Sequence, residues 1–263
     1  MSTELVNFSL QGSVAEVTLN RPDVLNSFNR EMSEQFIEVL QQVRENRQIR
    51  SVLLNASGRG FCAGQDLAEF KPGAAQSSAS LGEVVRTRYN PAIRLIRETE
   101  KPFICAVNGI AAGAGASIAL ACDLVFAGTG ASFVQSFCKV GLVPDSGGTF
   151  FLPRLVGLAR ATSLAMLGEK VPAEEAARIG LIYKVVPDSE LDKASRDCAT
   201  FLATQPTAGL GLIKRALNAS LANDLESQLI FEGELQQRAG KTKDYAEGVS
   251  AFFEKRAPSF SGE

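Results

Sequence analysis

The fold is decided by the stretch from Lys101 to Ala127, which reads KPFICAVNGIAAGAGASIALACDLVFA. Residues 103–107 form a short apolar run of the kind found in buried parallel strands. A glycine-rich turn, an alanine-rich helix and a second strand at 124–127 follow. The stretch is nearly as apolar as a membrane span, but Asn108 interrupts it and small residues dominate it. Alternating strands and helices therefore predict an α/β layered core.

The same alternation extends towards the N-terminus. Strands are predicted at Val14–Leu19 and Ser51–Asn55, and a helix at Asn29–Arg47 with Asn29 as its N-cap. A further helix is expected from Leu81 to Arg97. Beyond Ala159 nearly every segment is predicted to be helical; the candidates are Ala161–Leu167, Ala173–Arg178, Ala208–Ala219 and Asp244–Lys255. We therefore divide the chain into a core at 1–200 and a helical region at 201–263.

Composition excludes several kinds of chemistry. The chain has 263 residues, 27 basic and 29 acidic, a formal charge of -2 and no histidine. With no basic block, neither nucleic acid nor an anionic membrane is an expected partner. The five cysteines lack CxxC spacing, and without histidine neither a zinc site nor a histidine-based triad is expected. The N-terminus has no targeting pattern, so a cytoplasmic protein is expected. Lys71 to Ala79 is small and polar, which predicts a loop.

Two glycine-bearing loops each follow a predicted strand. The first, Phe61 to Asp66 (FCAGQD), and the second, Gly109 to Ser117 (GIAAGAGAS), precede predicted helices. Each has two interpretations: a tight strand-to-helix turn, or a set of backbone N–H groups able to hold a developing oxyanion. The glycine spacing does not match a dinucleotide fingerprint.

Asp145 is the candidate acid, in the stretch from Gly141 to Thr149 (GLVPDSGGT). Leu142 and Val143 precede it, so we expect an apolar environment that raises its pKa. A carboxylate of that kind can carry a proton at neutral pH. The alternative is a turn residue, because Pro-Asp-Ser-Gly-Gly is good turn chemistry.

Taken together these motifs resemble the crotonase, or enoyl-CoA hydratase/isomerase, superfamily. The matching pieces span nearly the whole chain; they are VTLNRPDVLNSFN, GRGFCAGQDL, KPFICAVNGIAAGAGASIALACDLVFA, KVGLVPDSGGTFFLPRLVG and EGVSAFFEKRAPSF. The resemblance implies a spiral β-β-α core with a C-terminal helical trimerisation region, and a homotrimer or hexamer. It also implies an acyl-CoA substrate, with no metal and no other cofactor.

The resemblance also implies roles for individual residues. The oxyanion hole carries over to the backbone N–H groups of Ala63 and Ala114. Residues that match CoA-contacting positions are Val24, Leu25, Ala63, Gly64, Gln65 and Asp66, with Phe252, Phe253 and Lys255 on the last helix expected to approach a neighbour's CoA.

Departures from the family pattern narrow the expected reaction. The two glutamates of the hydratases fall at Ser117 and Phe137, so hydration is not expected. Asp145 matches the acid of the isomerase branch, and Tyr89 to Pro91 and Leu202 to Lys214 also resemble it. A dehalogenase branch needs a histidine and a tryptophan, which this chain lacks. The implied activity is an isomerase that converts the ring 1,2-epoxide of phenylacetyl-CoA to the oxepin. A 3-enoyl-CoA to 2-enoyl-CoA isomerase and a non-catalytic acyl-CoA-binding subunit are the alternatives.

Overall fold

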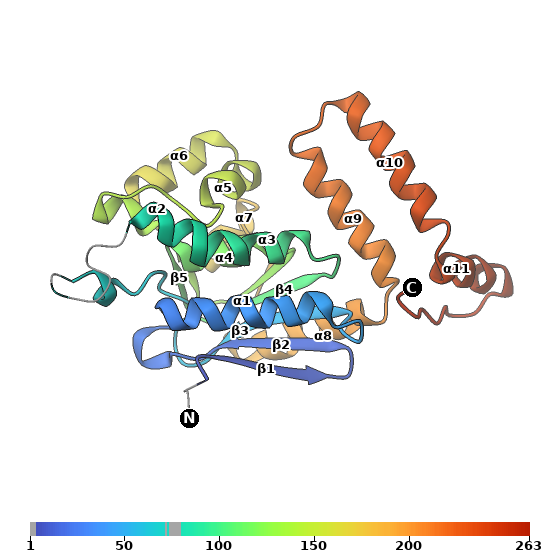
Figure 1. The fold of residues 1–263 in the computed structure, drawn as a ribbon, viewed down its shortest axis with the longest axis horizontal. Helices are drawn as coiled ribbons and strands as arrows, with labels where there is room; N and C mark the ends of the chain where they lie inside the picture. The colour runs from blue at the N-terminus through green and yellow to red at the C-terminus, as the bar shows by residue number, and fades with distance from the viewer. Residues whose placement is uncertain (1–3, 72, 74–79) are drawn as a thin grey trace.

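A computed structural model describes residues 4–71, 73 and 80–263 as an α/β protein built on two sheets (Figure 1). The larger sheet has the strand order β1-β2-β3-β4-β6-β9, and the smaller has the order β5-β7-β8. β1 is antiparallel to β2, the strands from β2 to β9 in the larger sheet are parallel, and β5 is parallel to β7. The predicted α/β class is confirmed. The strands are β1 Val6–Gln11, β2 Val14–Leu19, β3 Ser51–Ala56, β4 Phe103–Val107, β5 Ile110–Ala112, β6 Leu124–Gly128, β7 Ser132–Val134, β8 Lys170–Pro172 and β9 Lys184–Val186.

The parallel strands are apolar on both faces because both faces are covered. On β3, Val52 and Leu54 belong to the main core, whereas Leu53 belongs to a second cluster with Ile104 of β4. Side chains alternate along a strand, so neighbouring residues enter opposite layers. Helix α8 (Leu191–Ala203) packs against β3 and β4 and belongs to the second cluster through residues such as Ala199.

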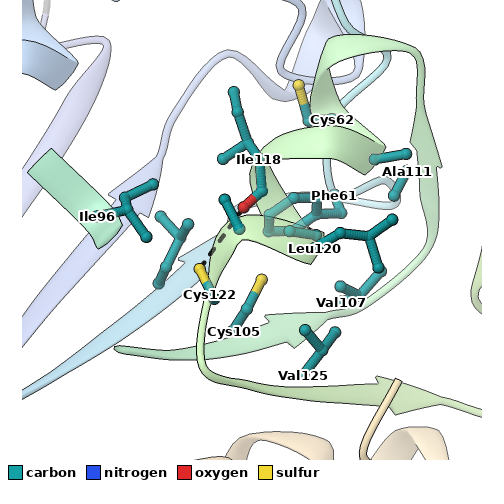
Figure 2. Packing of buried hydrophobic residues seen from close by; sticks show 14 of the residues in the cluster. Phe61, Cys62, Ile96, Cys105, Val107, Ala111, Ile118, Leu120, Cys122 and Val125 are labelled. Atoms are coloured by element: carbon teal, nitrogen blue, oxygen red, sulfur yellow. Dashed lines mark hydrogen bonds between the residues drawn. The ribbon is translucent and has the colours of Figure 1, made fainter. Parts of the chain in front are cut away.

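Helix α4 (Ala114–Ala121) lies inside the main core, and all of its residues are buried. Figure 2 shows Phe61, Cys62 and Ala111 near this helix, together with Val125 of β6. Its alanines and glycine allow close approach, which explains why the stretch is so rich in small residues.

Most predicted helices are confirmed, and the main surprises are short strands. Asn29 caps α1 by accepting a hydrogen bond from the Met32 N–H at 2.9 Å. The segment predicted as one helix from Leu81 contains a π-helical turn, Val85–Tyr89. β1 was not predicted, and β8 and β9 correct the expectation of an almost wholly helical C-terminal part. The remaining helices are α1 Arg30–Glu45, α2 Leu81–Val84, α3 Asn90–Glu98, α5 Gly148–Val156, α6 Leu158–Leu167, α7 Ala173–Arg178, α9 Thr207–Ser220, α10 Leu225–Ala239 and α11 Lys243–Glu254.

Helices α9, α10 and α11 extend to one side of the body that holds both sheets (Figure 1). They carry many exposed apolar side chains, among them Leu217, Leu225, Phe252 and Phe253. The division at residue 200 remains a prediction. Most of the loop expected at Lys71 to Ala79 lies outside the described residues. In the described part of the chain, no helix combines the length and apolar character needed to cross a membrane.

Candidate active site

The two glycine loops are hydrogen-bonded to each other. The Cys62 N–H donates to the Ile110 carbonyl at 3.1 Å, and the Ala112 N–H donates to the Cys62 carbonyl at 2.9 Å. A Cβ added to Gly115 would lie 2.7 Å from the Cys62 sulfur, closer than real Cβ contacts allow. Glycine at 115 therefore lets the start of α4 rest directly on the first loop.

The expectation that the Ala63 N–H is an oxyanion donor is wrong. This N–H donates to the Leu25 carbonyl at 2.9 Å, so it is already engaged within the fold. The bond joins the first glycine loop to the turn that follows β2. Ala63 therefore holds the loop in place and has no donor to offer a ligand.

The donor available on the first loop is the N–H of Gln65. The Phe28 N–H donates to the Gly64 carbonyl at 2.7 Å, and the Asp66 N–H donates to the Phe28 carbonyl at 2.8 Å. Because successive N–H groups of an extended segment point to opposite sides, the Gln65 N–H points away from Phe28. Among the described residues it has no acceptor.

The N–H of Ala114, predicted to be the other donor, is also left without a partner in the described ranges of the chain. Ala114 is the first residue of α4, where an N–H has no acceptor within the helix. No acceptor for it is found in the part of the chain that the structure describes. A Cβ added to Gly64 would lie 3.3 Å from the Ala114 nitrogen. The free N–H of Ala114 therefore sits beside the loop that carries the free N–H of Gln65.

Both the oxygen and the nitrogen of the Gln65 carboxamide are hydrogen-bonded, and together these bonds clamp the side chain. Its Oε1 accepts from the Tyr89 hydroxyl at 2.7 Å, and its Nε2 donates to the Phe28 carbonyl and to Glu69 Oε2, each at 3.0 Å. Arg88 donates to the same Glu69 oxygen at 3.0 Å. Tyr89 is buried and ends the π-helical turn, a feature often found at functional sites. This network fixes the residue whose N–H is free.

Asp145 lies in the turn before α5 and is half-buried. Burial raises the pKa of its carboxyl group, while the Ser146 hydroxyl, which donates to Oδ1 at 2.9 Å, lowers it in part. The turn interpretation is also correct, because the Gly148 N–H donates to the Asp145 carbonyl at 2.8 Å and Ser146 has φ +51°. Asp145 therefore both shapes the turn and presents a carboxyl group with a raised pKa.

Of the three apolar residues expected around Asp145, namely Leu142, Val143 and Phe137, only Phe137 is buried. Leu142 is 41% exposed and Val143 is 77% exposed, because the turn points both side chains to the surface. Phe137, by contrast, is buried, and its ring lies 3.7 Å from the position of a Cβ on Gly113, the N-cap of α4.

The charge of Asp145 acts on Tyr89, the residue whose hydroxyl holds the Gln65 side chain. Desolvation raises the pKa of the Tyr89 hydroxyl, and the charges of Cys62 and then Asp145 raise it further. A Cβ on Gly148 would lie 2.8 Å from the Ser117 hydroxyl, one turn along α4 from Ala114. The turn that carries Asp145 thus packs against α4, the helix that begins at Ala114.

The residues matched to CoA-contacting positions fall into two groups. Val24 is exposed, Leu25 has a left-handed backbone, and Asp66 pairs with Arg21 at 3.1 Å and caps a short 3₁₀ turn. Asp66 ends the first glycine loop, and Leu25 is joined to that loop by the hydrogen bond from the Ala63 N–H. The second group consists of Phe253 and Lys255.

Phe253 and Lys255 are not near this site in one chain. Phe253 belongs to α11 and Lys255 is its C-cap, and α11 lies to one side of the body that holds both sheets (Figure 1). Phe253 is 78% exposed. Within residues 4–71, 73 and 80–263, no group of three His, Cys, Asp or Glu side chains is arranged to hold a metal ion.

Two backbone N–H groups without acceptors among the described residues, beside glycine-rich turns of an α/β core, are an arrangement able to hold a developing oxyanion. The chain belongs to the enoyl-CoA hydratase/isomerase family, whose sequence model matches residues 9–263.

Individual relatives differ in the reaction that their names describe. The chain is 49% identical over 260 residues to the 1,2-epoxyphenylacetyl-CoA isomerase of Escherichia coli, covering 99% of both proteins. It is 44% identical, over the full length of both, to a Rhodobacter capsulatus protein named "Probable enoyl-CoA hydratase". A solved structure of the enoyl-CoA hydratase of Mycobacterium smegmatis matches with a TM-score of 0.91 at 32% identity, covering 97% of this chain and 98% of that one. The fold is therefore the crotonase fold.

Proposed function

We propose that this protein is an acyl-CoA isomerase that moves one proton within the acyl group. Its substrate is the ring 1,2-epoxide of phenylacetyl-CoA, which it converts to the oxepin. The observation that carries the proposal is that Asp145 is an acid with a raised pKa, whereas Ser117 and Phe137 stand where the family's hydratases have acids. The 49% identical relative from Escherichia coli, an isomerase by name, supports the same reaction.

The thioester oxygen would lie between the N–H groups of Gln65 and Ala114. Negative charge develops on this oxygen when a proton leaves the neighbouring carbon. Two donors fixed in advance stabilise that charge, and removing one such donor costs on the order of 3 kcal/mol in other enzymes. The clamp on the Gln65 side chain keeps its N–H in place before the substrate arrives.

Asp145 would act first as base and then as acid. Its carboxylate takes a proton from the carbon next to the thioester carbonyl, which forms the enolate. The C–C bond shared by the epoxide and the six-membered ring opens to give the seven-membered ring, and the carboxylic acid of Asp145 returns the proton to a conjugated ring carbon, so that the enzyme ends as it began. The raised pKa brings Asp145 closer to neutral pH, which helps both steps.

CoA would lie along the first glycine loop, in contact with Val24, Leu25, Gly64 and Asp66. Phe253 and Lys255 would reach a CoA molecule only from a second copy of the chain. The exposed apolar side chains of α9 to α11 support a homotrimer or hexamer, because isolated chains rarely leave so many uncovered.

The test is Asp145→Asn, assayed with the phenylacetyl-CoA epoxide. General acid–base groups contribute about 10²- to 10⁴-fold to rates, so we expect a loss of kcat within that range. Glu190→Gln, an exposed carboxylate in a short 3₁₀ turn far along the chain, is the matched control. Turnover by a folded Asp145→Asn protein at the wild-type rate would contradict the proposal.

Two further substrates separate the alternatives. A 3-enoyl-CoA turned over in preference to the epoxide would favour the fatty-acid isomerase, which needs the same residues. Tight binding of CoA esters without turnover of either compound would favour a non-catalytic binding subunit. We expect no hydration of crotonyl-CoA.

A further inference from the structure

One polar side chain inside the site has no role so far. Gln135, between β7 and the next 3₁₀ turn, is only 4% exposed, and its Oε1 is buried without a hydrogen-bond partner. No hydrogen bond of its carboxamide is found among the described residues. Buried amides are almost always hydrogen-bonded, because an unpaired one has lost its bonds to water and gained none in return. An unsatisfied one inside a candidate active site calls for an explanation.

Gln135 Oε1 and the hydroxyl group of Ser117 both lie close to Gly148. A Cβ on Gly148 would lie 2.8 Å from Ser117 Oγ, 3.2 Å from Pro144 Cβ and 3.6 Å from Gln135 Oε1. Ser117 is fully buried, and its hydroxyl makes only a long hydrogen bond to the Gly113 carbonyl, 3.3 Å. Because residue 148 has no side chain, the two polar groups converge beside the turn that carries Asp145.

The position of this pair relative to the proposed oxyanion hole indicates what it binds. Ser117 is three residues after Ala114 on α4, which places it roughly 4.5 Å further along the same side of the helix. When the thioester oxygen is held by Ala114, a ring carbon three bonds from the carbonyl carbon reaches that depth. Because the thioester oxygen is held by the N–H groups of Gln65 and Ala114, Gln135 and Ser117 are available to bind an atom of the ring.

We propose that Gln135 and Ser117 form a subsite for an oxygen atom carried by the ring of the acyl group. The Ser117 hydroxyl donates to a ring oxygen, and Gln135 Oε1 accepts a hydrogen bond from a ring hydroxyl. The ligand class is an aryl or cyclic acyl thioester with oxygen next to the side chain. This inference rests on the proposed function, and it explains how the site distinguishes an oxygenated ring from a plain acyl chain.

The experiment measures binding and needs no turnover. Phenylacetyl-CoA and 2-hydroxyphenylacetyl-CoA differ by one ring oxygen, and calorimetry gives Kd for each. A hydrogen bond to a buried polar group is commonly reflected in roughly a tenfold difference in affinity. We expect the wild-type protein to bind the hydroxylated ligand about tenfold more tightly and Gln135→Met to lose that preference. Gln41→Met, the same change on an exposed face of α1, should keep it.

Each result decides the matter. Equal affinities in the wild-type protein, or an undiminished preference in Gln135→Met, would overturn the subsite. If Gln135→Met does not fold, Ser117→Ala answers the same question, with a reduced preference expected and an unchanged one contradicting the proposal. Failure of both thioesters to bind the wild-type protein would instead refute the proposed function, so the two failures are distinguishable.

Discussion

The two sides of the site differ in how completely their polar groups are satisfied. On the first-loop side, the side chains of Gln65, Asp66 and Glu69 all have hydrogen-bond partners, whereas the Gln65 backbone N–H has no acceptor among the described residues. On the opposite side, Asp145 has a single side-chain hydrogen bond, from its neighbour Ser146, and Gln135 has none among the described residues. A satisfied network holds donors rigidly, whereas an under-satisfied carboxyl group keeps a pKa suited to exchanging protons. We propose that the first-loop side is the fixed side, which stabilises charge, and that the Asp145 side is the reactive side, which moves the proton.

The largest effect is expected when the first glycine loop is moved away from α4. Gly115→Ala would force its new methyl group against Cys62 and push the two loops apart. We expect kcat to fall about 100-fold or more, because a displaced donor costs on the order of 3 kcal/mol. Overpacking should also lower stability by about 1–3 kcal/mol. Steady-state kinetics and urea unfolding measure both effects.

Gly233→Ala is the matched control for that change. Gly233 lies on an exposed part of α10, and a Cβ there meets nothing within 4 Å. Alanine in a helix interior is favoured over glycine by about 1 kcal/mol, so this variant should be as active and slightly more stable. Equal activity in Gly115→Ala and Gly233→Ala would show that the contact with Cys62 does not position the donors.

A milder change loosens the clamp on Gln65. Tyr89→Phe removes the hydroxyl that donates to Gln65 Oε1 while keeping the ring packed near Phe28. A lost buried hydrogen bond costs about 1 kcal/mol, so we expect kcat to fall roughly fivefold with little change in KM. Tyr245→Phe, at an exposed tyrosine, is the control. A rise in KM alone would indicate that Tyr89 acts on binding and not on the donor.

Removing the Ser146 hydroxyl tests the role of Asp145 on the reactive side. Its hydroxyl stabilises the charged form of Asp145 and so lowers the pKa of that carboxyl group. Ser146→Ala should raise this pKa, and the acidic limb of the pH profile of kcat/KM should move to higher pH. The rate at the plateau should change little. A profile identical to that of the wild-type protein would mean that another group titrates on the acidic limb.

The smallest expected effect is on stability. Asp145 has a folded-state pKa above its ordinary value, so its contribution to stability is fully present at low pH and declines as the pH rises through the folded-state pKa. At pH 7 the charged, partly buried group is therefore unfavourable, and Asp145→Asn should melt at an equal or higher temperature, within a few degrees. At a pH below the ordinary pKa of aspartate the difference should vanish. A clearly lower melting temperature at pH 7 would assign Asp145 a structural role in its turn.

Features of the fold and the site that depend on local sequence pattern could be predicted. Features that depend on contacts between distant parts of the chain could not. The strand, turn and helix of 101–127 follow from hydrophobic pattern and small residues, and Asn29 follows from its capping chemistry. The short strands β8 and β9 have three residues each, too few for a pattern to distinguish them from turns.

The free donor could not be read from the sequence for a physical reason. Whether Ala63 or Gln65 offers its N–H is decided by pairing with Leu25 and Phe28, which lie more than thirty residues earlier. Likewise, Leu142 and Val143 are apolar, but the turn directs them outward. In contrast, the prediction that Asp145 carries the proton rests on the absence of histidine and on the family resemblance, which places non-acidic residues at 117 and 137.

The central claim is that one carboxyl group, Asp145, carries the proton in both directions. The direct measurement uses the phenylacetyl-CoA epoxide deuterated at the carbon next to the thioester, with the reaction run in ordinary water. A single carrier in a partly buried site returns some of the deuterium that it removed, so mass spectrometry should find label on the ring of the product. Ring positions that carry only solvent hydrogen, even in the first turnover, would show that separate groups remove and deliver the proton and would contradict the account.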